Sequence, residues 1–301
     1  QNRVSGLSFD IGVYTNISRD HMDYHPTLND YIGAKKKLFN SLKNNAVAIV
    51  NFDDPYGEEM VRDIIAKPLS YGLKGDFDFK GKIVENNISG LSIEIDGFEM
   101  TSRLIGEFNA YNLLVVFAVA KSLGEEALTV LTIISNLKAP DGRFEYIVSP
   151  SNVTAVIDYA HTPDALENVL KTLVSLKSDK EKIFTVFGCG GDRDKGKRPL
   201  MGEISSVYSD RVIVTSDNPR SEKPSEIIKE IVSGIPKSKS SKVLTVQDRR
   251  QAIKVACELA ESGDVILIAG KGHEKYQIIG DEKLHFDDLE TTIEIFKQIQ
   301  Q

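Results

Sequence analysis

The chain has 301 residues, 41% hydrophobic and 27% charged, a balance typical of a folded protein with room for two domains. Its net charge of −7 argues against a general nucleic-acid binder, and its longest apolar run, Leu113 to Ala120, is too short to span a membrane. Two cysteines, Cys189 and Cys257, give neither a disulfide framework nor a four-cysteine zinc site, so we expect a cytoplasmic protein.

The first expected strand, Gly12 to Ser18, is followed by a cluster of polar residues. The segment Arg19-Asp-His-Met-Asp-Tyr-His25 holds two histidines and two carboxylates. Such a cluster just past a strand end is typical of a metal or phosphate site, although polar loops also carry similar clusters by chance.

A helix is expected to begin near Thr27, which can cap it with Asp30 as acidic partner. Its apolar residues follow helical spacing and form one stripe: Leu28, Tyr31, Ile32, Leu38, Phe39 and Leu42. At about 100° per residue, Lys35 falls at the centre of this stripe, whereas Lys36 and Lys37 point away. A lysine in that place must snorkel, lose its proton, pair with an acid or be chemically modified.

A strand-rich stretch leads to a second set of polar residues. A buried strand is expected over Ala46–Asn51, and the short alternating runs between Leu69 and Arg103 predict antiparallel strands. The segment Gly106–Asn112 then opens a strongly apolar helix. Asn109 and Asn112 stand near its start, where an amide can cap the helix or contact a nucleotide base.

The turn Ala139–Gly142 divides the chain into two expected domains, 1–142 and 143–301. In the second domain we expect buried strands near residues 153–158, 183–187, 211–215, 242–246 and 264–269. Helical stretches separate these strands, which is typical of a mostly parallel, doubly wound sheet.

Four of these strands end in unusual loops. The loops are Asp158–Asp164, Gly188–Arg198, Ser216–Arg220 and Gly270–Glu274. In an open α/β sheet the carboxyl ends of parallel strands meet at one edge, where ligands bind. The sequence therefore predicts a binding site built from all four loops.

The glycine-rich loop is close to a phosphate-binding motif. From Gly191 to Arg198 it matches G-x-x-x-x-G-K, but Arg198 stands where a Ser or Thr hydroxyl would hold Mg²⁺. A true phosphate loop, another kind of anion or zwitterion site, and a solvated charged loop all stay open, and we favour the second. Cys189 is either a nucleophile or a small space-filling residue, and we favour the latter because no histidine is near it in sequence.

Six motifs, taken in order, resemble those of the Mur ligase family, and the resemblance runs along the whole chain. They are Thr15-Asn-Ile-Ser-Arg-Asp-His-Met-Asp-Tyr-His25, Gly106-Glu-Phe-Asn-Ala-Tyr-Asn112, Asp158-Tyr-Ala-His-Thr-Pro-Asp164, Gly188-Cys-Gly-Gly-Asp-Arg-Asp-Lys-Gly-Lys-Arg-Pro199, Asp217-Asn-Pro-Arg220 and Gly270-Lys-Gly-His-Glu274. The resemblance implies an α/β protein, with the rear part of a P-loop-type ATPase domain followed by a Rossmann-like, doubly wound C-terminal domain.

The resemblance also implies an activity. It is that of an ATP- and Mg²⁺-dependent ligase, expected to be a monomer, that adds meso-diaminopimelate to UDP-N-acetylmuramoyl-L-alanyl-D-glutamate in peptidoglycan synthesis. The motif Asp217–Arg220 resembles the version found in diaminopimelate-adding members, since lysine-adding members carry another residue at the position of Arg220. Addition of L-lysine, a folylpolyglutamate synthetase and a non-catalytic amino-acid or nucleotide-binding module are the alternatives.

Residue roles are implied by the same resemblance. Gln1 and Arg3 match positions that hold the UDP-linked substrate, His21 matches a Mg²⁺ ligand, and Lys35 matches a carbamylated lysine that also ligates Mg²⁺. The expected ATP contacts are Asn109 and Asn112 at the adenine, Asp158 at the ribose, and Arg143 and His161 near the phosphates. The expected pocket for the incoming amino acid consists of Arg193, Asp217, Asn218, Pro219, Arg220, Gly270 and Glu274.

One feature of the family is missing. No stretch of the chain matches G-x-x-x-x-G-K-[ST], which the family carries upstream of the segment that matches Gln1, and the UDP-binding domain is also absent. We therefore expect an N-terminally truncated fragment that binds ligands without turning them over.

Overall fold

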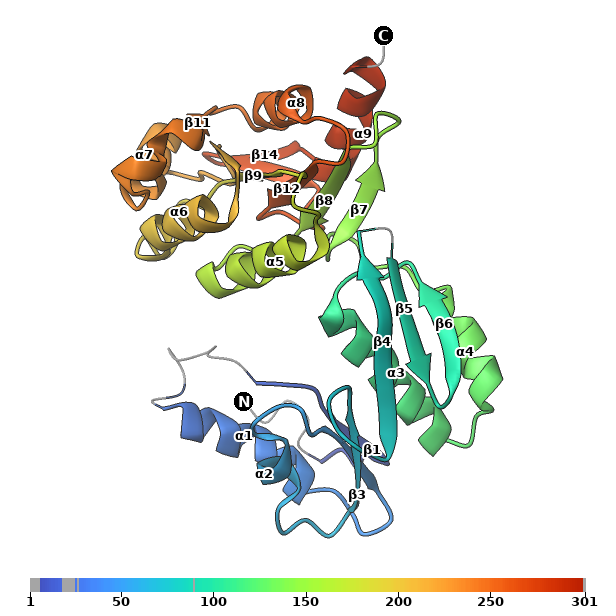
Figure 1. Ribbon diagram of the computed structural model, residues 1–301. Helices are drawn as coiled ribbons and strands as arrows, with labels where there is room; N and C mark the ends of the chain where they lie inside the picture. The colour runs from blue at the N-terminus through green and yellow to red at the C-terminus, as the bar shows by residue number, and fades with distance from the viewer. Residues whose placement is uncertain (1–5, 18–24, 26, 89, 300–301) are drawn as a thin grey trace. The chain divides into compact units, whose positions relative to one another are not determined.

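The computed structural model describes residues 6–17, 25, 27–88 and 90–299 of the chain. The chain divides into two compact units, residues 1–138 and 139–301 (Figure 1), and the division falls four residues before the boundary expected from the sequence. Both units combine helices with largely parallel sheets, so the expected α/β class is confirmed. No helix in the described ranges has the length and apolar character needed to cross a membrane.

The first unit contains a six-stranded sheet in the order β1-β2-β3-β4-β5-β6. Its strands are β1 (Ile11–Tyr14), β2 (Val47–Asn51), β3 (Lys67–Gly72), β4 (Phe79–Asn87), β5 (Gly90–Ile95) and β6 (Phe98–Ser102). The first four are parallel, and β5 and β6 continue the sheet antiparallel. The expectation of antiparallel strands from Leu69 onward is therefore wrong for β3, because alternation of polar and apolar residues does not specify strand direction.

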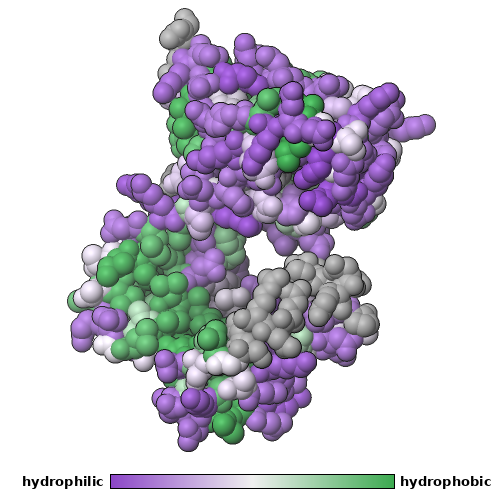
Figure 2. Space-filling view, turned by 180° about the vertical axis from the view of Figure 1, so that it is seen from behind, coloured by the Kyte–Doolittle hydropathy of each residue, from purple (hydrophilic) through white to green (hydrophobic). Residues whose placement is uncertain are grey.

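Four helices accompany this sheet: α1 (Leu28–Asn40), α2 (Gly57–Val61), α3 (Glu107–Ser122) and α4 (Ala127–Ser135). The α1 helix begins at Thr27, whose hydroxyl accepts from Asp30 N at 3.2 Å while the Asp30 carboxylate accepts from Thr27 N at 3.0 Å. This reciprocal cap confirms the expected start of the helix. Figure 2 shows apolar side chains gathered on one face of this unit, and the exposed ones on α3 and α4 are Phe108, Val116, Leu128 and Ile133.

The second unit contains a six-stranded sheet in the order β11-β10-β9-β12-β8-β7. Its strands are β7 (Glu145–Val148), β8 (Thr154–Asp158), β9 (Ile183–Phe187), β10 (Arg211–Val214), β11 (Val243–Thr245) and β12 (Val265–Ala269), and all are parallel except β7. Every residue of β8, β9 and β12 is buried, as their continuous apolar runs predict. A hairpin of β13 (Tyr276–Ile279) and β14 (Glu282–His285) follows the sheet.

Helices connect the strands of the second sheet (Figure 1). They are α5 (Pro163–Leu176), α6 (Lys197–Tyr208), α7 (Pro224–Ser233), the 3₁₀ helix η1 (Lys237–Lys242), α8 (Arg249–Leu259) and α9 (Asp288–Ile299). Phe184 and Val186 of β9 share a core with Ile253 of α8 and Ile295 of α9. The chain thus wraps its helices around a buried parallel sheet, which leaves the strand ends at one edge for a site.

A buried ion pair joins the starts of α8 and α9. Arg249 Nε donates to Asp288 Oδ1 at 2.8 Å and its NH2 donates to Asp288 Oδ2 at 2.7 Å, and neither side chain is exposed. The same NH2 donates to Ala269 O at the end of β12. The guanidinium therefore links both helices to the strand edge.

We predict that Asp288→Ala lowers the free energy of unfolding by about 3–5 kcal/mol, because it leaves a buried guanidinium without its counter-ion. Urea denaturation followed by circular dichroism measures the change. Glu226→Ala, which breaks the exposed Lys229–Glu226 pair, is the control and should leave the midpoint unchanged. An unchanged midpoint for Asp288→Ala would contradict the prediction.

Candidate functional site

The ends of four parallel strands meet at one edge of the second sheet. Gly270 N, after β12, donates to Asp158 O of β8 at 3.1 Å, and Thr215 N, after β10, donates to Phe187 O of β9 at 2.9 Å. The four loops that sequence reasoning selected therefore lie together, as predicted from the order of the strands.

The glycine loop and the Ser216–Arg220 loop pack backbone against backbone. Gly191 N donates to Asn218 O at 2.9 Å. A Cβ atom on Gly191 would collide with Pro219 O, and one on Gly190 would lie 2.9 Å from Arg220 NH1. Gly191 is therefore needed because any side chain there would push the two backbones apart, whereas a side chain at Gly190 would displace the Arg220 guanidinium.

Arg198 occupies the position that distinguishes this loop from a phosphate loop. Its side chain is fully buried and donates to Glu222 Oε1 and Oε2 at 2.9 and 3.0 Å, to Glu230 Oε2 at 2.7 Å and to Gly190 O at 3.0 Å. The hydrogen bonds from Arg198 lower the pKa of Glu222 to about 2. Arg198 thus holds the glycine loop in place through these hydrogen bonds. Because an arginine occupies this position, the loop has no hydroxyl that could bind Mg²⁺ there.

Arg220 has the left-handed backbone conformation, with φ at 51°. Its backbone is fixed by hydrogen bonds from Arg220 N to Ile278 O and from Gly280 N to Arg220 O, at 3.2 and 2.8 Å. Its guanidinium NH1 donates to Gly191 O at 2.8 Å. The side chain is therefore held over the glycine loop, and its Nε and NH2 donate no hydrogen bond to the described residues.

The other predicted amino-acid contacts lie around this arginine. Asn218 Nδ2 donates to Glu274 Oε2 at 2.9 Å, which joins the loop after β10 to the loop after β12. Arg193, in contrast, is exposed on the glycine loop. Sequence reasoning missed Lys271, which is fully buried 3.0 Å from Asp217 Oδ1, because a lysine in a loop ordinarily faces solvent.

Asp158 is buried and uses both carboxylate oxygens within the protein. Oδ1 accepts from Ala160 N and Oδ2 from Phe144 N, each at 2.8 Å. Burial raises the pKa of this carboxyl, and the two backbone hydrogen bonds oppose the rise. These contacts shape the loop after β8, and the ribose role stays a prediction.

One arginine and two histidines surround the ring of Tyr159. The Arg143 guanidinium lies 4.8 Å from the ring centroid, and the His161 ring lies 4.5 Å from it. His273, which sequence reasoning did not select, lies 4.9 Å from the same ring. Arg143 and His161, the expected phosphate contacts, thus both lie against the ring of Tyr159.

The first unit has a cavity of about 360 Å³ between the end of β1, the loop after β2 and the start of α3. Asn112 lines it and donates from Nδ2 to Asn109 Oδ1 at 3.2 Å, while Asn109 Nδ2 donates to Ile105 O at 2.8 Å. Tyr111 Oη donates to Asp53 Oδ2 at 2.9 Å in the same cavity. Both the nitrogen and the oxygen of the Asn109 amide are therefore used within the protein, whereas Asn112 Oδ1 accepts no hydrogen bond from the described residues.

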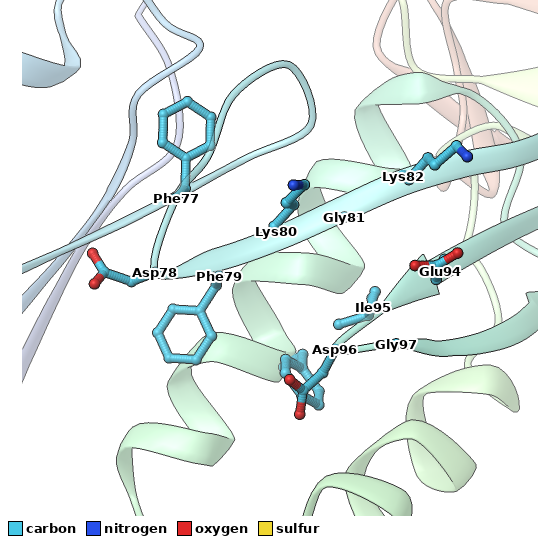
Figure 3. A pocket seen from close by; sticks show the side chains of 11 residues that line it. Phe77, Asp78, Phe79, Lys80, Gly81, Lys82, Glu94, Ile95, Asp96 and Gly97 are labelled. Carbon is cyan, nitrogen blue, oxygen red and sulfur yellow. The ribbon is translucent and has the colours of Figure 1, made fainter.

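A second cavity of the first unit, of about 510 Å³, lies on β4 and β5. Figure 3 shows Lys80 and Lys82 on one side of β4 and Phe79 on the other. None of the residues predicted to bind ligands lines this cavity, so it does not enter the candidate site.

Lys35 differs from its expected environment. It is exposed, and its Nζ lies 5.3 Å from the Tyr31 ring centroid. Lys36, expected to point away, is instead largely buried and pairs with Glu59 at 2.8 Å. Tyr31, Ile32 and Phe39 of the same stripe are buried, so the helical spacing was correctly identified, but the Lys35 side chain itself reaches solvent, and burial gives no reason for its modification.

Three predicted site residues, Gln1, Arg3 and His21, lie outside the described residues. Within the described ranges, no cluster of three or more histidine, cysteine, aspartate or glutamate side chains is suited to hold a metal ion. The described residues therefore do not by themselves form a Mg²⁺ site.

Two family models match the chain. The Mur ligase middle domain matches residues 1–120, and the Mur ligase glutamate ligase domain matches residues 142–272. Among solved structures, a UDP-N-acetylmuramoyl-L-alanyl-D-glutamate–2,6-diaminopimelate ligase is 37% identical with a TM-score of 0.70, covering 99% of this chain and 62% of that one. MurF from Thermotoga maritima in complex with ADP, 20% identical over 97% of this chain and 62% of its own, shares the fold with a TM-score of 0.67.

Curated relatives agree with this result. The UDP-N-acetylmuramoyl-L-alanyl-D-glutamate–2,6-diaminopimelate ligase of Parabacteroides distasonis is 51% identical over 98% of this chain and 61% of its own length. The protein of the same name from Cytophaga hutchinsonii is 50% identical over 96% of this chain and 59% of its own length. The chain thus spans about three fifths of these relatives. From the two domain matches and these identities, the chain belongs to the Mur ligase family.

Proposed function

We propose that the chain is part of an ATP-dependent amide ligase that adds meso-diaminopimelate to UDP-N-acetylmuramoyl-L-alanyl-D-glutamate in cytoplasmic peptidoglycan synthesis. The observation that carries the proposal is the placement of Arg220 over the glycine loop, beside the hydrogen-bonded Asn218 and Glu274. The names of the relatives, which specify this reaction, support the same substrate.

Recognition of the amino acid follows from its charges. The far end of diaminopimelate carries a carboxylate and an ammonium, whereas that of lysine carries an ammonium alone. Arg220 has Nε and NH2 free to bind the distal carboxylate as a fork, and the Glu274 carboxylate suits the ammonium. Lysine would bring its ammonium next to an unpaired guanidinium, which disfavours the alternative substrate.

In the proposed reaction, the D-glutamate γ-carboxylate oxygen attacks the γ-phosphorus of ATP, which gives an acyl phosphate and ADP. The amine of diaminopimelate attacks the acyl carbon and loses a proton, and the tetrahedral oxyanion then expels phosphate to leave the amide. Arg143, held on Tyr159, supplies positive charge for the phosphates, and the neighbouring His161 ring offers a hydrogen-bonding nitrogen.

We assign the adenine of ATP to the 360 Å³ cavity of the first unit. The Asn112 carbonyl oxygen is suited to accept a hydrogen bond from the exocyclic amine of adenine, because Asn112 Nδ2 is already engaged by Asn109. Guanine carries a carbonyl at the equivalent position and would be rejected.

The remaining roles rest on the family resemblance. They are binding of the UDP-linked substrate by Gln1 and Arg3, and binding of Mg²⁺ by His21 and a carbamylated Lys35. The Lys35 side chain is exposed, so its nitrogen is accessible to carbon dioxide, which reacts with the neutral amine. The monomeric state also stays a prediction.

The alternative of a non-catalytic amino-acid or nucleotide-binding module leads to a first prediction. We expect the 301-residue chain alone to hydrolyse no ATP above background, because it lacks the loop whose backbone N–H groups and lysine stabilise charge on the transferring phosphoryl group. Phosphate release by the purified chain measures this, and activity that stays with the chain through successive purification steps would contradict it.

A second prediction concerns Asn112. Replacement by leucine should weaken ADP binding about fivefold to tenfold, equal to about 1–1.4 kcal/mol for one lost hydrogen bond, and leave GDP binding unchanged. Isothermal titration calorimetry of the chain with both nucleotides tests this. Asn136→Leu, on the exposed end of α4, is the control. Equal losses for ADP and GDP would refute the adenine contact.

A third prediction concerns Arg220. Both Arg220→Ala and Arg220→Lys should weaken the binding of meso-diaminopimelate by about 10- to 100-fold, since a charge-assisted pair contributes about 1.5–3 kcal/mol and lysine cannot form the fork. ADP binding should not change. Calorimetry also compares L-lysine, and wild-type chain that binds L-lysine as tightly as meso-diaminopimelate would disprove the substrate assignment.

A further inference from the structure

Lys271 is a buried cation at the centre of the loops that surround the proposed amino-acid pocket. Its side chain is 0% exposed, and its Nζ donates to Asn218 Oδ1 at 3.0 Å and to Tyr276 O at 2.7 Å. It also lies 3.0 Å from Asp217 Oδ1, as an ion pair, since that oxygen makes no hydrogen bond to the described residues. Burial lowers the pKa of Lys271, and Asp217 opposes the decrease.

These contacts fix the orientation of the Asn218 amide. Asn218 Oδ1 accepts from Lys271 Nζ and also from Ile278 N at 2.9 Å, so both donors face the oxygen. The amide nitrogen must then point the other way, where it donates to Glu274 Oε2. Lys271 therefore positions Glu274 through Asn218, although within the described residues its side chain forms no hydrogen bond or ion pair with the Glu274 carboxylate itself.

The same cation changes the charge balance of the pocket. Asp217 is paired with Lys271, and Asp288 is paired with Arg249 close by. Asp217 and Asp288 each pair with a cation within 3.0 Å, whereas Glu274 makes no ion pair within the described residues and interacts with Arg249 only at longer range. Asp217, which the family resemblance placed in the amino-acid pocket, is thus already paired with a cation of the protein.

We infer that Lys271 is a positioning residue that makes the pocket selective for a zwitterionic side-chain end. It orients Glu274 toward the ammonium of the ligand, and it neutralises Asp217. The groups of the pocket other than Arg220 then carry one net negative charge, that of Glu274. Without Lys271, Asp217 would add a second negative charge, which attracts an ammonium and repels a carboxylate. The inference rests on the proposed function, because it takes diaminopimelate as the ligand.

The test compares ligands rather than activities. Calorimetry of the 301-residue chain gives the ratio of the dissociation constants of L-lysine and meso-diaminopimelate, which should be at least about tenfold for the wild type. Lys271→Met should reduce this preference about tenfold or more, to near unity. Lys271→Arg, which keeps the positive charge, should retain the preference within about threefold.

Two further variants separate positioning from a general loss of stability. Leu173→Ala removes a fully buried side chain from α5 and should lower the melting temperature without altering the ligand preference. The double variant Lys271→Met with Asp217→Asn carries no unpaired buried aspartate, so it should fold even if the single variant does not. Its ratio of the dissociation constants of L-lysine and meso-diaminopimelate should be at least about threefold higher than that of Lys271→Met. If Lys271→Met does not fold, the ratio of the double variant should be above one.

The outcomes are distinguishable. A wild type that prefers meso-diaminopimelate while Lys271→Met keeps the same preference overturns the role of Lys271 and leaves the proposed function standing. A double variant with no preference at all would overturn the charge-balance argument. A wild type with no preference between the two amino acids overturns the proposed function itself, and the inference with it.

Discussion

The close approach of two loops is the constraint on which the rest of the site depends. The glycine loop after β9 lies directly against the Asp217–Arg220 loop, and Gly191 admits no Cβ there. Arg198 fixes the glycine loop through hydrogen bonds to Glu222 and Gly190, so the residue at which this loop departs from the phosphate-loop motif serves packing. Because the backbones of the two loops are in contact, the guanidinium of Arg220 reaches over the glycine loop and donates to Gly191 O.

The second unit was the more predictable part of the chain. Its strands β8, β9 and β12 are fully buried, so each appears in sequence as an apolar run ended by a polar or glycine loop, and β9 was located to the residue. The order of the strands then brings four loop ends to one edge without further information. The pairing of strands that are distant in sequence could not be predicted. The alternating pattern of β3 suggested an antiparallel strand, yet β3 pairs parallel with β2.

The side-chain errors have a common physical origin. Helical spacing gives the direction in which Lys35 points but not whether another element covers it, and it is exposed. Conversely, Lys271 stands in a polar loop, and its burial depends on contacts with Asp217 and Asn218, which come from a distant part of the chain. Asp158 was correctly placed at a strand end, but only the structure reveals that both its oxygens bind backbone N–H groups.

The backbone of Arg220 carries a consequence of its own. A left-handed conformation costs a non-glycine residue about 1–2 kcal/mol, and Asp192 in the facing loop adopts it as well, at φ 54°. Asp192 is secured by hydrogen bonds from Ser221, and Arg220 by the β-bridge to Ile279. Folding free energy from the surrounding contacts is thus stored as local strain where ligand recognition is proposed, and relief of that strain would compete with a rigid binding surface.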